Sequence, residues 1–158
     1  MGQQNPTVMI SLGGNAISPK NESGTIDEQF AHTRESLAAV MGFVKRRYNI
    51  CIAHGNGPQV GAELQRNELT QDIIPALPLG VLVANTQGAI GYMIQQSLQN
   101  ALYKEDANRE VVSIISQVKV DKDDSELMNP KKYIGKSYDK ETAIDLSKKH
   151  GWTVKEQE

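Results

Sequence analysis

Two glycine-rich stretches carry the residues whose types and spacing could do chemistry in this 158-residue sequence. The first reads SLGGNA over residues 11–16, and the second reads HGNGPQVG over residues 54–61. Each follows an apolar run that is typical of a buried strand. Because glycine has no Cβ, such loops can bring several backbone N–H groups close to an anion. The pair predicts an oxyanion-binding site, although either loop taken singly is also typical of a tight strand exit.

The second loop adds two features to this prediction. Pro58 lies where a proline is tolerated in the first turn of a helix, and the N-terminus of that helix would favour an anion. His54 could act as a general base, but it could equally have a structural purpose at the end of the strand. The glycine pattern of a phosphate-binding P-loop is absent from the sequence, and G-x-G-x-x-G does not follow the first apolar run.

Composition excludes several classes of protein. The sequence is 39% hydrophobic and 23% charged, with a formal net charge of -2, so it has no basic field for a nucleic-acid partner. No stretch approaches the roughly 20 apolar residues that cross a bilayer, and no secretory leader is evident. The single Cys51 cannot form an internal disulfide, and we expect it in the core of a cytoplasmic protein. His32 and His150 lack ligand-spaced partners, so no metal site formed by protein side chains is expected.

The remaining sequence alternates strand and helix patterns, which predicts an α/β fold. Strands are expected over residues 7–12, 49–53 and 111–116, with the start of another at 152–154, and helices over 25–47, 58–70, 79–103 and 139–150. Such alternation predicts a three-layer α/β/α domain whose mainly parallel sheet is covered on both faces. Ligands of such sheets collect at the carboxyl ends of the strands, where both glycine loops lie.

Residues 121–138 interrupt this alternation with a polar, turn-rich stretch. We expect it to project from the sheet as a small subdomain. Its cluster of Asp121, Asp123 and Asp124 is typical of a solvated turn, with a Mg²⁺ contact as the alternative.

Small residues recur along the long helical pattern at 79–103. Ala84, Gly88 and Gly91 would let another helix or backbone segment approach closely, or would form a contact between subunits.

Several long motifs, in order, make the chain similar to the carbamate kinase family of the amino acid kinase superfamily. They are ISLGGNAI, IAHGNGPQVG, PALPLGVLVANTQGAIGYMIQQSL, SQVKVDKDD, NPKKYIG and HGW. The resemblance covers residues 1–158 as the N-terminal part of an amino acid kinase domain, truncated, with 121–138 as its protruding subdomain. It implies reversible phosphoryl transfer between carbamoyl phosphate and ADP, which gives ATP and carbamate.

The resemblance also implies which residues form the site. The substrate-binding positions that it places around the transferred phosphoryl group are Gly13, Gly14, Asn15, Gly55, Asn56 and Gly57. It places the catalytic lysine of the NPKKYIG motif at Lys132, with the neighbouring Lys131 as the alternative. Related kinases carry a lysine where this chain has Ser11, so the resemblance assigns that positive charge to Lys132. Phosphoryl transfer needs little proton transfer, which favours a structural role for His54.

Carbamate kinases continue through a second half that holds ATP or ADP with Mg²⁺, and the sequence contains no counterpart of it. We expect either a segment of a longer enzyme or a naturally short chain, inactive alone in both cases, with a homodimer as the implied assembly. Two alternatives belong to other classes. One is an anion-binding module that holds carbamoyl phosphate, phosphate or sulfate without turnover, and the other is a self-association module.

Overall fold

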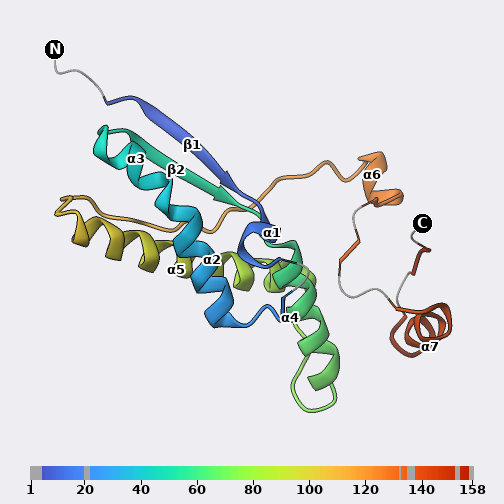
Figure 1. Ribbon diagram of the computed structural model, residues 1–158. Helices are drawn as coiled ribbons and strands as arrows, with labels where there is room; N and C mark the ends of the chain where they lie inside the picture. The colour runs from blue at the N-terminus through green and yellow to red at the C-terminus, as the bar shows by residue number, and fades with distance from the viewer. Residues whose placement is uncertain (1–4, 20–21, 132, 135–137, 152–153, 157–158) are drawn as a thin grey trace.

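The structure is a computed structural model that describes residues 5–19, 22–131, 133–134, 138–151 and 154–156 (Figure 1). Its elements in chain order are β1 (Thr7–Leu12), α1 (Gly14–Ile17), α2 (Ile26–Ala38), α3 (Val40–Lys45), β2 (Asn49–His54), α4 (Gly57–Thr70), α5 (Leu79–Lys104), α6 (Ser125–Met128) and α7 (Lys140–His150). The predicted α/β class is confirmed. None of the helices in these ranges combines the length and apolar character that a bilayer crossing requires.

A parallel pair of strands forms the sheet. β1 and β2 run in register from the pair Thr7 and Asn49 to the pair Leu12 and His54. Alternate residues of both strands face a core that also receives side chains from α1, α2, α3 and α5, as the period of two in a strand requires. The buried members of this core are Leu12, Ile17, Leu37, Val40, Val44, Ile90, Met93, Ile94, Leu98 and Leu102.

The opposite face of the sheet is exposed in the part of the chain that the structure describes. Met9 on β1 is 71% exposed, and its register partner Cys51 on β2 is exposed beside it. The prediction that Cys51 is a core residue is therefore wrong, because it falls on the outward-facing phase of β2. Of the three expected layers, the described residues supply the sheet and the helices on one of its faces.

The expected helix over 25–47 forms as two consecutive helices. The first of them begins with a capping box: the Thr25 hydroxyl accepts from the Glu28 backbone N–H, and the Glu28 carboxylate accepts from the Thr25 N–H at 2.8 Å. A tighter turn, in which the Gly42 N–H donates to the Ala39 carbonyl, separates α2 from α3. Both helices still cover the same face of the sheet (Figure 1).

The strand expected over 111–116 does not form a ladder. Glutamine side chains of α5 pair with its backbone instead: the Gln99 amide accepts from the Val111 N–H at 2.9 Å and donates to the Arg109 carbonyl. The Gln87 amide likewise accepts from the Ser116 N–H at 2.9 Å and donates to its carbonyl. A carboxamide presents the same donor and acceptor as a peptide group, so the two glutamines satisfy the ends of this segment without a neighbouring strand.

The small residues of α5 make this contact possible. A Cβ at Gly91 would lie 3.2 Å from Ser113, whose hydroxyl donates to the Gly91 carbonyl, and a Cβ at Gly88 would lie 3.9 Å from Ile115. The interpretation that small residues let another backbone segment approach α5 is confirmed for these two glycines.

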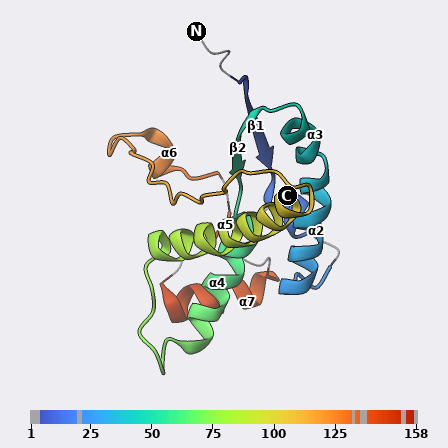
Figure 2. The same ribbon diagram turned by 90° about the vertical axis from the view of Figure 1, so that its left-hand side faces the viewer.

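The C-terminal third of the chain makes fewer contacts with the core. All described residues from 121 to 134 are exposed, and α6 lies away from the sheet in both views (Figures 1 and 2).

The Asp139 carboxylate caps α7 by accepting from the Thr142 N–H at 2.9 Å, and this bond holds the pKa of Asp139 below its usual value. Gly151 ends the helix in the left-handed region with φ of 71°, a conformation that glycine adopts readily. The strand predicted from Trp152 falls mainly outside the described residues.

Candidate functional site

The two glycine loops meet at the carboxyl edge of the sheet. β1 and β2 are parallel and in register, so their last residues, Leu12 and His54, lie side by side and both chains leave the sheet at one edge. The Gly55 N–H donates to the Leu12 carbonyl at 2.9 Å, which carries the pairing one residue past the end of β2. α1 then begins at Gly14 and α4 at Gly57, so both loops lead directly into helices (Figure 1).

Two of the glycines allow the loops to touch each other. A Cβ at Gly55 would lie 3.2 Å from the Gly14 backbone nitrogen, and a Cβ at Gly14 would lie 3.0 Å from Pro58 Cδ and 3.6 Å from the Gly57 nitrogen. The distances of 3.2 and 3.0 Å are shorter than an ordinary van der Waals contact, so a side chain on either residue would require its neighbour to shift. The contact between the loops therefore explains why SLGGNA and HGNGPQVG have glycine at positions 14 and 55.

The other two glycines face open space. A Cβ at Gly13 or at Gly57 would meet no heavy atom within 4 Å, and both residues are exposed. Packing within the described chain therefore does not explain why these positions lack a side chain.

No side chain caps α4, the longer of the two helices that begin here. Asn56 is its N-cap residue, with φ of -144° and ψ of 13°, but the Asn56 side chain makes no capping bond. Pro58 has no N–H, and the Val60 N–H is used within the helix by the Asn56 carbonyl. The N–H groups of Gly57 and Gln59 thus remain without a side-chain cap, and the positive end of the helix dipole lies at the same place.

The Asn56 side chain bonds to α5 instead. Its Nδ2 donates to Thr86 Oγ1 at 3.0 Å and lies 3.5 Å from the Val83 carbonyl oxygen. The Thr86 hydroxyl in turn donates to the Val83 carbonyl at 2.8 Å, and Thr86 is only 3% exposed. Asn56, a predicted substrate-binding residue, therefore contributes its backbone to the loop while its amide nitrogen fixes the loop to α5.

The other predicted site residues differ in how the structure places them. Asn15 is exposed on α1, next to Gly14. His54 is half-buried, and its Nδ1 lies 3.2 Å from the Gly55 carbonyl oxygen, a local contact that fits a structural role. Lys131 forms an ion pair with Glu126 of α6 at 2.7 Å, whereas Lys132 lies outside the described residues.

The segment that follows the first loop is anchored to α2. The Gln29 amide donates to the Gly24 carbonyl at 2.8 Å and accepts from Gln59 Nε2 of α4 at 3.2 Å. His32 Nε2 lies 2.6 Å from the Glu22 carboxylate, and this hydrogen bond raises the pKa of His32 above its ordinary value of 6.5. Both anchors hold residues 22–24 against the helix that follows.

The predicted aspartate cluster forms a turn. The Asp121 carboxylate accepts from the Asp123 N–H at 3.0 Å, and the Asp124 carboxylate caps α6 by accepting from the Glu126 N–H at 2.9 Å. In the ranges that the structure describes, no group of three or more His, Cys, Asp or Glu side chains lies where it could hold a metal ion.

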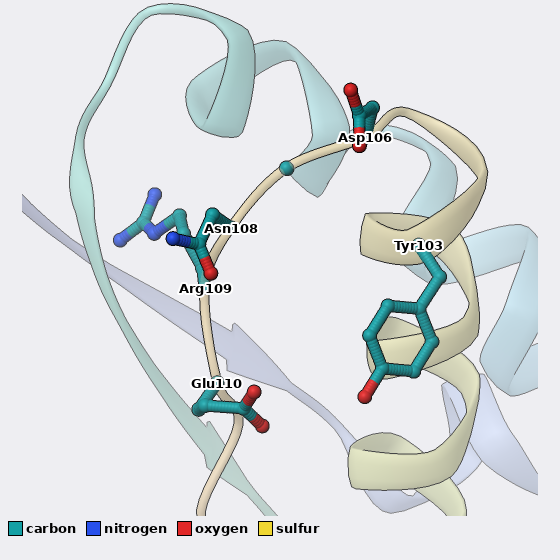
Figure 3. Close-up of a pocket in the computed structure, with 6 residues that line it drawn as sticks. Tyr103, Asp106, Asn108, Arg109 and Glu110 are labelled. Carbon is teal, nitrogen blue, oxygen red and sulfur yellow. The ribbon is translucent and has the colours of Figure 1, made fainter.

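A shallow hollow of about 290 Å³ lies elsewhere, beside the turn after α5. Figure 3 shows that its side chains do not converge: the Tyr103 ring lies on α5, and Arg109 extends from the opposite side of the turn. The Arg109 guanidinium already donates to the Tyr48 carbonyl at 2.7 Å, one residue before β2 begins. The hollow is thus near the amino ends of the strands, away from the glycine loops.

Several residues that shape the site carried no sequence signal. A threonine within a helix, such as Thr86, is ordinary, and so is a glutamine in a first turn, such as Gln29 or Gln59. Only the packing of α5 and α2 against the loops shows what these side chains do.

The fold and the loops define an α/β protein in which two glycine loops meet at the carboxyl edge of a parallel sheet. No family model matches the chain. Carbamate kinase of Pyrococcus horikoshii is 46% identical over 151 residues, which are 94% of this chain and 48% of that protein. Carbamate kinase of Trichomonas vaginalis is 39% identical over 94% of this chain and 48% of its own length.

Solved structures give the same result. Carbamate kinase from Giardia lamblia bound to citric acid superposes with a TM-score of 0.86 and 33% identity, over 95% of this chain and 48% of that one. The resemblance found in the motifs is confirmed: the chain is a homologue of carbamate kinase. It spans about half the length of the curated relatives it matches.

Proposed function

We propose that this chain forms the substrate half of a carbamate kinase and binds carbamate or carbamoyl phosphate between its two glycine loops. The observation that carries the proposal is the open side of the loops, where Gly13 and Gly57 face no neighbouring atom and the first turn of α4 has no side-chain cap. Backbone N–H groups and a helix N-terminus there suit an oxyanion. The names of the relatives supply the reaction class.

The chemistry of phosphoryl transfer suggests separate roles for the loops and for Lys132. Carbamate is already an anion, so the reaction depends on positioning and on cations rather than on a general base. In this proposal the loops position the substrate, and Lys132, on the segment that carries α6, supplies a cation. ATP or ADP with Mg²⁺ would bind to the part of carbamate kinases that this chain does not match, so the chain alone would not turn over. A cytoplasmic location is part of the same proposal.

Self-association is the second candidate function, and one observation favours it. Apolar side chains are exposed along the end of α4, the connection to α5 and the first turn of α5: Leu69, Ile73, Ile74, Leu77, Leu79 and Val81. Several exposed apolar side chains on consecutive segments are typical of a contact with another protein. A homodimer would cover it, and light scattering at high micromolar concentration distinguishes a dimer from a monomer.

An isotope-labelled sample tests the binding proposal. Carbamoyl phosphate, or inorganic phosphate as a simpler anion, should shift the backbone amide signals of Gly13, Gly14, Gly57 and Gln59 in a saturable way. Signals near the hollow at Tyr103 should not move. Saturable shifts confined to other parts of the chain, or no shifts at millimolar ligand, would contradict the proposal.

A second experiment tests whether turnover needs both the second half of a carbamate kinase and Lys132. The purified chain should form no ATP from carbamoyl phosphate and ADP. The same chain fused to the remaining half of Pyrococcus horikoshii carbamate kinase should form ATP, and a fusion carrying Lys132→Ala should lose most of that activity. Turnover by the unfused chain would overturn this assignment.

A further inference from the structure

One glutamine joins the segment after the first glycine loop to the helix after the second. Gln29 lies half-buried on α2, where its Nε2 donates to the Gly24 carbonyl at 2.8 Å and its Oε1 accepts from Gln59 Nε2 of α4 at 3.2 Å. In the part of the chain that the structure describes, α2 and α4 otherwise meet mainly through α1, which packs against both of them. The Gln29 side chain is therefore a direct polar link between elements that flank the two loops.

The orientation of both amides follows from what they face. A carbonyl only accepts, so Gln29 must turn its Nε2 to Gly24 and its Oε1 to Gln59, which then donates its own Nε2. Gln59 Oε1 is left buried, without a hydrogen-bond partner among the described residues. Without Gln29 both ends of the Gln59 amide would be unpaired, which is unfavourable inside a protein, so the bond to Gln29 keeps this amide between the helices.

We propose that Gln29 is a positioning residue that holds segment 22–24 and the first turn of α4 in a fixed relation, so that both respond when the substrate binds. The inference rests on the function proposed above. Gln59 follows two residues after Gly57, whose backbone is assigned to the substrate, so a shift of α4 on binding would pass through the two amides to Gly24. The Gln29 side chain need not touch the substrate.

Side-chain NH₂ signals of an isotope-labelled sample test the link without ligand. In the unaltered chain the Gln59 NH₂ signals should differ from those of a solvent-exposed glutamine. Gln29→Met keeps the length of the side chain and removes both polar groups, so Gln59 loses its acceptor and its signals should move to the exposed position. Gln59 signals that do not change in Gln29→Met would show that Gln29 does not hold this side chain, and would overturn the proposal.

The response of Gly24 to ligand is the second test. Carbamoyl phosphate should shift the backbone amide signals of Gly24 and Gly57 with the same saturation. Gln59→Met interrupts the link at α4, so Gly57 should still respond while Gly24 loses most of its shift. Glu22→Gln is the matched control, because it weakens the contact with His32 that holds the same segment against α2 and leaves both amides in place, so Gly24 should still respond.

Two outcomes of this titration would contradict the proposal. One is a Gly24 signal that stays unmoved in the unaltered chain while Gly57 shifts, and the other is a Gly24 signal that still shifts in Gln59→Met.

Affinity for carbamoyl phosphate gives a third readout. Without the link the substrate must itself order segment 22–24 and the first turn of α4, so Gln29→Met should weaken binding about fivefold, the factor that one net hydrogen bond is worth. Gln29→Met and Gln59→Met break the same link, so the double variant should bind no more weakly than Gln29→Met alone. Losses that add in the double variant would give the two glutamines separate packing roles and overturn the proposal.

Failure of this inference can be distinguished from failure of the proposed function. If carbamoyl phosphate shifts neither Gly57 nor Gly24 in the unaltered chain, the proposed function is wrong, and the side-chain signals still decide whether Gln29 holds Gln59. If Gln29→Met does not fold, the Gly24 response in Gln59→Met and Glu22→Gln decides the role of the link.

Discussion

The inner and outer glycines of the two loops differ in what surrounds them. At Gly14 and Gly55 an added Cβ would meet atoms of the opposite loop at 3.0 and 3.2 Å, whereas at Gly13 and Gly57 it would meet nothing within 4 Å. Glycine is therefore required for two different reasons within the same motifs. The inner pair lets the loops pack, and the outer pair leaves the backbone accessible, which is how a binding site differs from a tight turn.

The largest effect on stability is expected at the inner pair. Gly55→Val would force a branched side chain against the backbone of Gly14, and we expect a loss of about 3 kcal/mol in the free energy of unfolding. Urea unfolding followed by circular dichroism measures this loss. Gly57→Val is the matched control and should lose less than about 1 kcal/mol. Equal losses would remove the distinction between inner and outer glycines.

A smaller effect is expected for Gly14→Ala. Its Cβ would lie 3.0 Å from Pro58 Cδ, a side-chain atom, so a small shift of the proline ring could relieve part of the clash. We expect a loss of about 1 to 2 kcal/mol in the free energy of unfolding. Gly13→Ala is the control and should be nearly neutral. A neutral Gly14→Ala would show that the loops separate more easily than their packing indicates.

Gly24 extends the comparison to a glycine that is required for backbone conformation. Its φ is +70°, and a Cβ would also lie 3.2 Å from the Ser18 hydroxyl, so Gly24→Ala should cost about 1 kcal/mol. Gly24→Asn should cost less, because asparagine adopts the left-handed region more readily. Thermal unfolding of both variants checks the order, and a Gly24→Asn that is the less stable of the two would contradict this cause.

The pH dependence of the first loop gives the smallest effect. The Glu22 contact raises the pKa of His32, so its stabilisation is fully present below 6.5 and is lost as the pH rises through the raised pKa of the folded state. Glu22→Gln should therefore lower the pKa of His32, measured by an NMR titration of its ring. Any difference in stability from the unaltered chain should be seen below pH 6.5 and fade at higher pH. An unchanged His32 pKa would contradict the assigned partner.

Much of the fold followed from local patterns, and the misses have physical causes. The strands at 7–12 and 49–54, the Thr25 capping box and the left-handed Gly151 depend on neighbouring residues, so the sequence predicts them. The segment 111–116 has a strand composition, but a strand needs a hydrogen-bonded neighbour, and Gln87 and Gln99 take that place here. Cys51 was misplaced because an apolar run does not reveal which face of a two-stranded sheet is covered.

The site was predictable to a similar degree. Gly13, Gly14, Gly55 and Gly57 are recognisable as a pair of loops because they follow parallel strands, but only coordinates separate the packing pair from the open pair. The bond between Asn56 and Thr86 joins residues 30 positions apart, and no local rule predicts it.

Binding of carbamoyl phosphate to Gly57→Val and to His54→Asn tests the central claim most directly. A branched side chain at the open side should obstruct the anion and weaken binding at least tenfold, while the fold persists. His54→Asn leaves both loop backbones intact and should bind within about twofold of the unaltered chain. If His54→Asn abolishes binding while Gly57→Val binds normally, a mechanism centred on the His54 side chain must replace the backbone cradle.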